Sequence, residues 1–310
     1  MRAAHIRRVT GTVVTAVVLG CLPAWSGSGA TALPAAVAPH DAGAATPTVR
    51  HIALDGAVNV RDLGGLRTEK GRQVRYGQVF RADALGKLTD ADVAKLSALR
   101  LRTVVDFRVP GEVQRDGADR LPTGVTPLSR PVNDLGLYDT IMAAIGSRDP
   151  VRQQEMLGDG KAARYMSDIY RTFVTDPASR RQFAATLQDL AHGKQSPLLY
   201  HCTSGKDRTG WMSYLLLRAV GVPAGTAERD YLLSNSIRAE ADLATREGLR
   251  KAGLMENPDL LIPLQEVREE YLDAALDQAE RDYGSLHGYL TEGLGLDRSD
   301  LARLRTRLVR

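Results

Sequence analysis

Short apolar runs alternate with amphipathic segments along the first two-thirds of the chain after residue 50. Three runs of four or five residues, bounded by turn signals, predict buried strands at 78–81, 103–107 and 198–201. Because predicted strands and helices alternate, this pattern predicts an α/β fold in which helices cover both faces of one sheet.

Capping residues mark the helices between these strands. Thr89 precedes a segment with apolar positions at helical spacing and with Asp92 in its first turn, where a negative charge is favoured. Asp176 and Pro177 open a second helix, and Gly193 follows its last turn. Each pattern predicts both the helix and the residue at which it begins.

The last third of the chain has only helical patterns. Residues 211–220 are apolar on nearly all sides, which predicts a buried helix that stops at Gly221. After Pro223 the clearest helical patterns cover 264–283 and 298–308. Since there is neither an internal repeat nor a low-complexity linker, residues 51–310 are predicted to form one domain.

The first 38 residues have the pattern of an export signal: a basic start, an apolar stretch at 9–22 and small residues up to Ala38. The apolar stretch is short for a membrane span. Residues 39–50 are predicted to be a flexible leader. We therefore expect a secreted or extracytoplasmic protein, with lipoprotein processing and anchoring at Cys21 as the alternative.

Composition excludes several classes of protein. The 310 residues include 41 Lys and Arg against 37 Asp and Glu, and three of the arginines lie in the predicted signal, so a nucleic-acid-binding surface is not expected. The two cysteines, Cys21 and Cys202, are too few for a disulfide scaffold or a cysteine-type zinc site. No metal and no organic cofactor are predicted.

The strongest chemical signal lies between the predicted strand 198–201 and the buried helix that follows. Its residues are His201, Cys202, Thr203, Ser204, Gly205, Lys206, Asp207, Arg208, Thr209 and Gly210. A short loop that enters a helix directs several backbone N–H groups at one point, to which the helix dipole adds positive charge. Gly205 permits a left-handed turn, and Arg208 offers paired donors for phosphate oxygens. We therefore predict that Thr203, Ser204, Gly205, Lys206 and Arg208 bind phosphate.

Cys202, at the other end of the loop, is the candidate nucleophile. Thiols at helix N-termini beside arginine have pKa values lowered from about 8.5 to roughly 3.5–7.5. The five residues between Cys202 and Arg208 can wrap a tetrahedral oxyanion so that sulfur attacks phosphorus in line and forms a phosphocysteine. Thr209 is placed to donate to the departing thiolate, and His201 to orient the loop.

Other interpretations of this loop are weaker. A lone cysteine at the end of a strand is usually a small core residue, but Cys, Gly, Arg and Thr in this spacing favour chemistry. A nucleotide-binding P-loop needs Ser or Thr where Asp207 stands. A Cys–His protease is disfavoured because His201 precedes Cys202 on a strand and points to the opposite face.

These residues resemble the bacterial protein-tyrosine phosphatases of the Cys-x5-Arg superfamily. The subgroup is similar to the secreted mycobacterial tyrosine phosphatase B and the Listeria lipid-and-tyrosine phosphatase. The resemblance covers nearly the whole chain after residue 51. Besides the loop, it rests on residues 59–65, 79–81, 105–108 with Glu112, 164–166, 230–232 with Ser234 and Asn235, 271–272 and 283–286.

The resemblance implies a phosphatase-type sheet flanked by helices, with a helical C-terminal part. It also implies that Cys202 is the nucleophile and that Arg208 clamps the phosphate. Asp207 becomes the candidate general acid, inside the loop itself. A helical lid is implied at about 135–164.

Four further residues have two interpretations each. The resemblance makes Arg61 and Asp62 supports of the site, whereas spacing alone favours an Asx turn before a Gly-Gly bend. Asp106 ends a buried strand at the sheet edge where ligands bind, so it is a second candidate acid, but a capping or ion-paired Asp fits equally well. Lys206 is either a solvated lysine or, by resemblance, a contact for the extra phosphates of phosphoinositides.

The sequence thus predicts an exported phosphatase that hydrolyses phosphotyrosine monoesters in proteins or peptides through a phosphocysteine. The alternatives are a broad-specificity or phosphoinositide phosphatase and a catalytically dead phosphate-binding module. The intact set of Cys202, Asp207, Arg208 and Thr209 disfavours the dead module.

Overall fold

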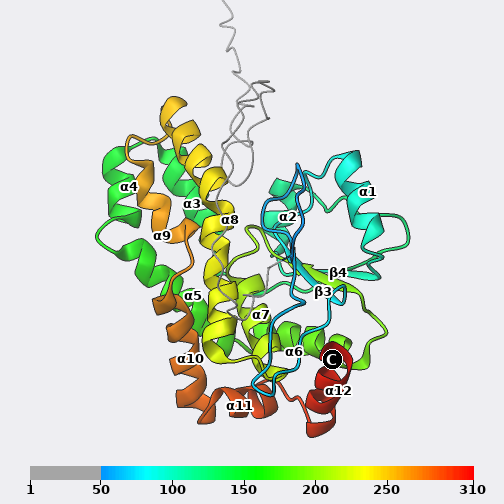
Figure 1. Cartoon of the computed structure of the whole chain (residues 1–310). Coiled ribbons are helices and arrows are strands. Elements are labelled where there is room, and N and C mark those ends of the chain that lie inside the picture. Colours follow the sequence, from blue (N-terminus) through cyan, green and yellow to red (C-terminus); the bar gives the residue numbers. More distant parts are fainter. Residues whose placement is uncertain (1–49) are drawn as a thin grey trace, which may run out of the picture.

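A computed structural model describes residues 50–310 of the chain (Figure 1). The predicted export signal at 1–38 and the alternative processing site at Cys21 lie outside the described residues. So does the predicted leader at 39–50, except for its last residue, Arg50, which belongs to the first strand.

A six-stranded sheet has the order β1-β2-β3-β6-β4-β5. Its strands are β1 (Arg50–His51), β2 (Arg61–Asp62), β3 (Val79–Ala82), β4 (Thr103–Asp106), β5 (Thr126–Ser129) and β6 (Leu198–His201). The last four strands in this order are parallel to one another. Three of them, β3, β6 and β4, are the strands that the sequence predicts. Ala82, His201 and Asp106 are paired at the carboxyl ends of β3, β6 and β4, so the segments that follow these strands meet at one edge.

Helices lie on both sides of the sheet (Figure 1). They are α1 (Asp90–Ala98), α2 (Pro110–Asp116), α3 (Leu137–Ser147), α4 (Pro150–Leu157), α5 (Lys161–Thr175), α6 (Pro177–His192), α7 (Arg208–Ala219), α8 (Ala224–Lys251), α9 (Ile262–Gln265), α10 (Glu269–Tyr283), α11 (Leu286–Gly288) and α12 (Arg298–Leu308), with a 3-10 helix η1 (Pro258–Leu261) and a π-helix η2 (Tyr289–Gly293). The C-terminal third is helical, as predicted.

Alternate strand residues enter two separate hydrophobic cores. Val105 and Tyr200 join the larger cluster with Trp211 of α7, whereas Val104 and Leu199 join the smaller one with Leu96 of α1. Successive residues of a strand point to opposite faces, so two cores require helices on both sides. The predicted α/β class, with a covered sheet and a helical C-terminal part, is confirmed.

The capping signals are confirmed at both helices. Thr89 accepts from the backbone of Asp92, and the Asp92 side chain accepts from the backbone N–H of Thr89, which forms a capping box. Asp176 accepts from Ser179 at the start of α6, and Gly193 ends that helix with a left-handed φ of 70°. The buried helix predicted at 211–220 begins three residues earlier, at Arg208.

The prediction of one helix over 264–283 is wrong, because the chain leaves the helical conformation between α9 and α10. Asn235 of α8 replaces helical hydrogen bonds there: its side-chain amide donates to the Val267 carbonyl and its oxygen accepts from the Val267 N–H, both at 2.8 Å. A partner 32 positions away thus decides this break.

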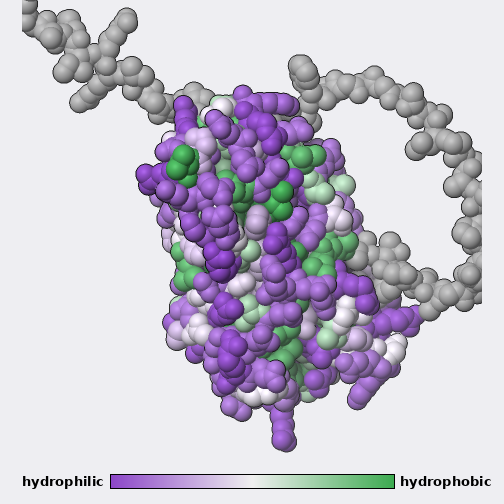
Figure 2. Space-filling view, turned by 90° about the vertical axis from the view of Figure 1, so that its left-hand side faces the viewer, coloured by the Kyte–Doolittle hydropathy of each residue, from purple (hydrophilic) through white to green (hydrophobic). Residues whose placement is uncertain are grey.

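Hydrophilic residues cover most of the face seen in Figure 2, and hydrophobic residues form small separate groups on it. The large hydrophobic side chains that are exposed within the described residues are Leu135, Val151 and Leu243, which come from three different segments. None of the helices in residues 50–310 is both long enough and apolar enough to cross a membrane.

Candidate active site

The loop predicted to bind phosphate connects the end of β6 to the start of α7. Cys202 directly follows β6 and is 2% exposed, and Arg208 is the first residue of α7. Gly205 has a φ of +64°, and a Cβ atom there would lie 2.3 Å from the carbonyl oxygen of Ala82. Glycine is therefore required both by the backbone conformation and by the close approach of β3.

Donors outside the loop hold its carbonyl groups. The Thr203 carbonyl accepts from the backbone N–H of Ala84 at 3.0 Å. The remaining contacts are from Asn59 Nδ2 to the carbonyls of Ser204 (3.2 Å) and Gly205 (3.0 Å), from Arg238 Nη1 to Ser204 (3.3 Å) and from Arg81 Nη2 to Gly205 (2.8 Å). With its carbonyls engaged from outside, the loop is free to use its N–H groups for an anion.

A buried ion-pair network holds these donors in turn. Asp230 accepts from Arg61 Nε at 3.0 Å and from Arg81 Nη1 at 2.7 Å, and Arg61 Nη1 donates to Asn59. Burial and the neighbouring Arg81 lower the pKa of Arg61 to about 10, so it remains charged at neutral pH. Arg61 thus supports the phosphate loop through Asn59, as the resemblance implies.

Asp62, the second predicted support, has a different position. Its carboxylate accepts from the backbone N–H groups of Gly64 at 2.8 Å and Gly77 at 2.7 Å. The contact with Gly64 is the Asx turn that the spacing favours. Asp62 stabilises the turns beside β2, and none of its described hydrogen bonds reaches the phosphate loop.

Arg208 is held by a carboxylate that the sequence reasoning did not place in the site. Its two terminal nitrogens donate to the Glu112 carboxylate at 2.7 and 2.6 Å, and Thr203 Oγ1 donates to the same group at 2.5 Å. Burial raises the pKa of Glu112, but Arg208 outweighs it and lowers the value to about 2. Glu112 therefore fixes the guanidinium plane of Arg208. Glu112 is among the residues that carry the family resemblance and is an acidic residue in the first turn of a Pro-initiated helix, but neither signal pairs it with Arg208.

Asp207, the candidate acid, lies in a polar cluster at the opposite side of the loop. Lys206 Nζ donates to both of its oxygens, at 2.9 and 2.7 Å, and Tyr170 of α5 donates at 3.0 Å. Lys206 also donates to the carbonyl of Glu266 at 3.3 Å, in the break between α9 and α10. Lys206 is 2% exposed, so the interpretation as a solvated lysine is wrong.

Two predicted supports flank the reacting loop. Thr209 is fully buried, and its hydroxyl has no hydrogen-bond partner among the described residues, so it is free to donate to another group. His201 is fully buried; its Nε2 lies 2.8 Å from Asp119 and its Nδ1 lies 3.2 Å from the Cys202 carbonyl oxygen. The imidazole thus contacts the Cys202 backbone rather than acting as its base.

Asp106 is not brought together with Cys202. Its carboxylate accepts from Arg108 Nη2 at 2.8 Å and from Arg108 Nε at 3.0 Å. Asp106 lines a different groove, and Cys202 is not among the residues that line that groove. The interpretation as an ion-paired Asp is the one that the structure supports. Within residues 50–310, Asp106, Asp119 and His201 have ligand atoms within 4.8 Å of one another, but the positive charge among them is supplied by Arg108.

A pocket with about 380 Å³ of empty space surrounds Cys202 and Arg208. Leu137, Tyr138 and Ile141 of α3 line it, so part of the predicted lid segment at 135–164 borders the pocket that contains Cys202. Leu264 of α9 lines it too. The side chains of the phosphate loop in the pocket are Cys202, Thr203, Ser204, Lys206, Asp207 and Arg208.

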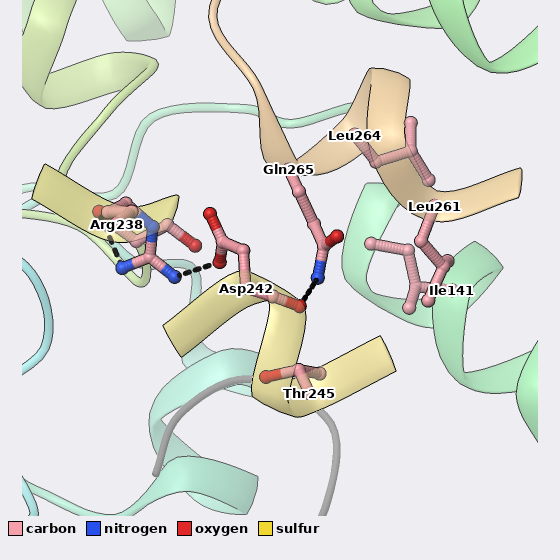
Figure 3. Close-up of a pocket in the computed structure, with 8 residues that line it drawn as sticks. Ile141, Arg238, Asp242, Thr245, Leu261, Leu264 and Gln265 are labelled. Carbon is pink, nitrogen blue, oxygen red and sulfur yellow. Dashed lines mark hydrogen bonds and ion pairs between the residues drawn. The ribbon is translucent and has the colours of Figure 1, made fainter. Parts of the chain in front are cut away.

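A second pocket adjoins the first and shares Ile141, Ser204 and Leu264 with it. Figure 3 shows Arg238, Asp242 and Thr245 of α8 on one side and the leucines of η1 and α9, with Ile141, on the other. Arg238 Nη2 donates to Asp242 at 2.8 Å, so both charges are paired within the protein. The empty space of this second pocket is about 380 Å³, the same as that of the first pocket.

Comparison with known proteins gives a consistent result. The model of the tyrosine phosphatase family matches residues 52–310. A Cupriavidus necator protein named as a candidate tyrosine-protein phosphatase is 34% identical over 268 residues, covering 86% of this chain and 92% of its own. Triple specificity protein phosphatase PtpB of Mycobacterium tuberculosis is 31% identical over 273 residues, covering 81% and 96%. A tyrosine-protein phosphatase of Nostoc commune is 28% identical over 276 residues, covering 86% and 87%.

Among solved structures, TpbA of Pseudomonas aeruginosa in complex with phosphotyrosine aligns with 76% of this chain and 98% of its own. The sequence identity is 17% and the TM-score is 0.30. A second TpbA structure aligns with 67% of this chain, with 18% identity and a TM-score of 0.33.

Proposed function

The chain belongs to the tyrosine phosphatase family and is a protein-tyrosine phosphatase, and from this premise we propose that it is an exported enzyme that hydrolyses phosphotyrosine monoesters through a phosphocysteine on Cys202. The observation that carries the proposal is that Cys202 and Arg208 line one pocket at the two ends of the phosphate loop, whose carbonyl groups accept hydrogen bonds from donors outside the loop. Each part suits a tetrahedral oxyanion.

The reaction has two steps. In the first, the Cys202 sulfur forms a bond to phosphorus while the bond from phosphorus to the tyrosine oxygen breaks, and Asp207 gives that oxygen a proton. In the second, water attacks phosphorus while the bond from sulfur to phosphorus breaks, and the Asp207 carboxylate takes up the proton that the water loses. Inorganic phosphate leaves, and the buried hydroxyl of Thr209 donates to the departing thiolate. The loop N–H groups and Arg208 stabilise the equatorial oxygens in both transition states.

Asp207 must carry a proton for the first step, yet its described contacts are donors. Lys206 and Tyr170 both donate to it, so a proton on Asp207 requires one of these contacts to rearrange. Asp207 also lies in the same pocket as Cys202, which Asp106 does not. We therefore place the general acid at Asp207 and expect activity to be highest on the acidic side of neutrality.

Helix α3 acts as the lid in this proposal. Leu137, Tyr138 and Ile141 of α3 line the pocket that holds Cys202 and Arg208, so a movement of α3 would change access to the nucleophile. The backbone amides of α3 should exchange hydrogen faster than those of α6, and bound vanadate should slow the exchange of α3.

The second candidate function is a broader specificity that includes other phosphoesters. Its support is the buried ammonium group of Lys206 in the pocket, together with the name of the M. tuberculosis relative, a triple specificity protein phosphatase. Comparison of kcat/KM on phosphotyrosine and phosphoserine peptides and on phosphoinositides decides between the two.

The experiment that tests the mechanism is rapid acid quenching followed by mass spectrometry of the modified peptide. Phosphate on Cys202 supports the proposal, whereas phosphate on another residue overturns it. Turnover of any phosphate ester excludes the dead binding module. Export is tested separately, by locating the protein in cell fractions and sequencing its mature N-terminus.

A further inference from the structure

Four consecutive carbonyl groups at the start of the phosphate loop contact donors outside the loop, and one of these donors is a histidine side chain, whose charge can change with pH. Backbone, amide and guanidinium groups hold the carbonyls of Thr203, Ser204 and Gly205. The Cys202 carbonyl instead lies 3.2 Å from Nδ1 of His201. The protonation state of that imidazole therefore matters for the peptide group of the nucleophile.

Both ring nitrogens of His201 face oxygen atoms. A backbone carbonyl only accepts hydrogen bonds, so Nδ1 carries a hydrogen and donates to the Cys202 oxygen. Nε2 lies 2.8 Å from Oδ2 of Asp119, and the ring is fully buried, so water does not compete for either position. The remaining question is whether the proton between Nε2 and Oδ2 belongs to the histidine or to the acid.

The surroundings of Asp119 place that proton on His201. The other carboxylate oxygen, Oδ1, accepts from Arg108 Nη2 at 2.8 Å and from the backbone N–H of Leu85 at 3.3 Å, and both contacts stabilise the anion. Asp106 is a second carboxylate near the ring, with Oδ1 at 3.9 Å from Nε2. The charged groups that face His201 among the described residues are thus Asp119, Asp106 and Arg108.

The electrostatics agree with this geometry. Burial lowers the pKa of His201, but the carboxylates of Asp119 and Asp106 outweigh burial and raise it to about 9. Burial raises the pKa of Asp119, but His201 and Arg108 hold it below its ordinary value.

We infer that Asp119 is a positioning residue for this phosphatase: its carboxylate keeps His201 as a doubly protonated imidazolium, whose Nδ1–H fixes the carbonyl of Cys202. The inference rests on the proposed role of Cys202 as nucleophile. Neither His201 nor Asp119 lines the pocket around Cys202, so both act through the loop backbone. A doubly protonated ring has no lone pair for a metal, so the cluster of Asp106, Asp119 and His201 holds a proton there instead.

The first test does not depend on catalysis. In protein labelled with ¹⁵N-histidine, His201 is assigned by the resonance that disappears in His201→Gln. We expect both ring nitrogens to be protonated at pH 7 and to titrate near pH 9. A neutral ring at pH 7 overturns the inference, even if a phosphocysteine on Cys202 has been trapped. Conversely, phosphate trapped on a residue other than Cys202 overturns the proposed mechanism and leaves this measurement of His201 intact.

The second test uses Asp119→Asn, which preserves shape and removes charge, with Asp106→Asn as the matched variant. With the Asp119 charge removed, the pKa of His201 should fall and the ring should become neutral, keeping its Nδ1–H but losing the positive charge that strengthens the hydrogen bond to the Cys202 carbonyl. We therefore expect kcat/KM to drop about fivefold at pH 7.5 and to recover at pH 5.5. Asp106→Asn keeps the contact between Asp119 and His201, so it should lower kcat/KM at alkaline pH less than Asp119→Asn does.

Two outcomes of the second test overturn the inference. An equal loss of kcat/KM at every pH means that Asp119 has only a structural role. Inhibition of the unmodified enzyme by zinc that Asp119→Asn relieves means that the cluster binds a metal in place of the proton. If Asp119→Asn does not fold, the resonances of His201 in the unmodified protein decide.

Discussion

Two buried arginine clusters lie at the same edge of the sheet, and only one of them belongs to the proposed active site. Arg208 pairs with Glu112 at 2.7 and 2.6 Å beside Cys202. Arg108 pairs with Asp106 and Asp119, both at 2.8 Å, beside His201. In both clusters the arginine is nearly or fully buried and is matched by carboxylates.

Side-chain charge does not separate the two clusters, because each joins two cationic groups to two carboxylates. In the first cluster, Lys206 and Asp207 add one cation and one carboxylate to the pair of Arg208 and Glu112. In the second cluster, His201 adds a cation to Arg108 and its two carboxylates. What differs is the backbone: the first cluster surrounds a loop that enters helix α7, with its carbonyl groups engaged from outside. The N–H groups of that loop and the helix dipole supply the excess positive potential that an oxyanion needs.

The largest expected effect is the loss of the nucleophile on the Arg208 side. Cys202→Ser should lower kcat by about 10⁵-fold or more, because a serine hydroxyl at this position lacks the nucleophilicity of a thiolate. Phosphate binding should persist, since the loop N–H groups and Arg208 remain. Steady-state kinetics and vanadate titration measure the two properties. Substantial turnover by the variant would contradict the mechanism.

Arg208→Ala should have the next largest effect: kcat/KM should fall about 10³-fold and vanadate binding should be lost. The reason is that the guanidinium donates to the phosphate oxygens both in the transition state and in bound phosphate. Its counterpart, Arg108→Ala, removes the partner of two buried carboxylates instead. We expect that variant to be less stable but to bind vanadate if it folds. Equal loss of vanadate affinity in both would remove the distinction between the clusters.

Replacement of the candidate acids sharpens the comparison through the leaving group. Asp207→Asn should lower kcat/KM about 10²-fold for a phenol of high pKa and far less for an activated coumarin phenol, which leaves without a proton. Asp106→Asn should show no such dependence, because its carboxylate pairs with Arg108 away from Cys202. If only Asp106→Asn selectively loses poor leaving groups, the acid is Asp106.

Glu112 links the active cluster to stability at acid pH. Its folded-state pKa of about 2 is below the ordinary 4.5, so it stabilises the fold above pH 4.5 and loses that contribution as the pH falls toward 2. The shift corresponds to roughly 3 kcal/mol in the free energy of unfolding. Urea unfolding between pH 5 and pH 3 should show a decline that is smaller in Glu112→Gln. An equal decline in both proteins would contradict this.

The smallest expected effect is that of chelators. EDTA should leave kcat/KM unchanged, because the mechanism uses Cys202, Asp207 and Arg208, and the carboxylates of the other cluster are already paired with Arg108. Activity that is lost on dialysis against a chelator and restored by a divalent ion would show that a metal takes part.

Vanadate should inhibit competitively, and mild oxidation should inactivate the enzyme reversibly as long as the oxidation of Cys202 stops at sulfenic acid.

Local sequence determined much of this protein. Strands 78–81, 103–107 and 198–201, the caps at Thr89 and Asp176 and the phosphate loop all follow from patterns within a few residues of one another. Cys202 and Arg208 belong to one strand-loop-helix segment, so their spacing places them around the same anion. Signals of this kind are readable because the hydrogen bonds and backbone angles that produce them are local.

The tertiary structure alone decided which charges meet. Glu112 reaches Arg208 across 96 positions, Asp119 reaches His201 across 82, and Asn235 interrupts the helix predicted over 264–283. Asp106 looked like a second acid because it ends a strand at the right edge, but its pairing with Arg108 draws it away from the nucleophile. Buried charges must find partners wherever the fold brings them, and that choice depends on the packing of distant elements rather than on any local pattern.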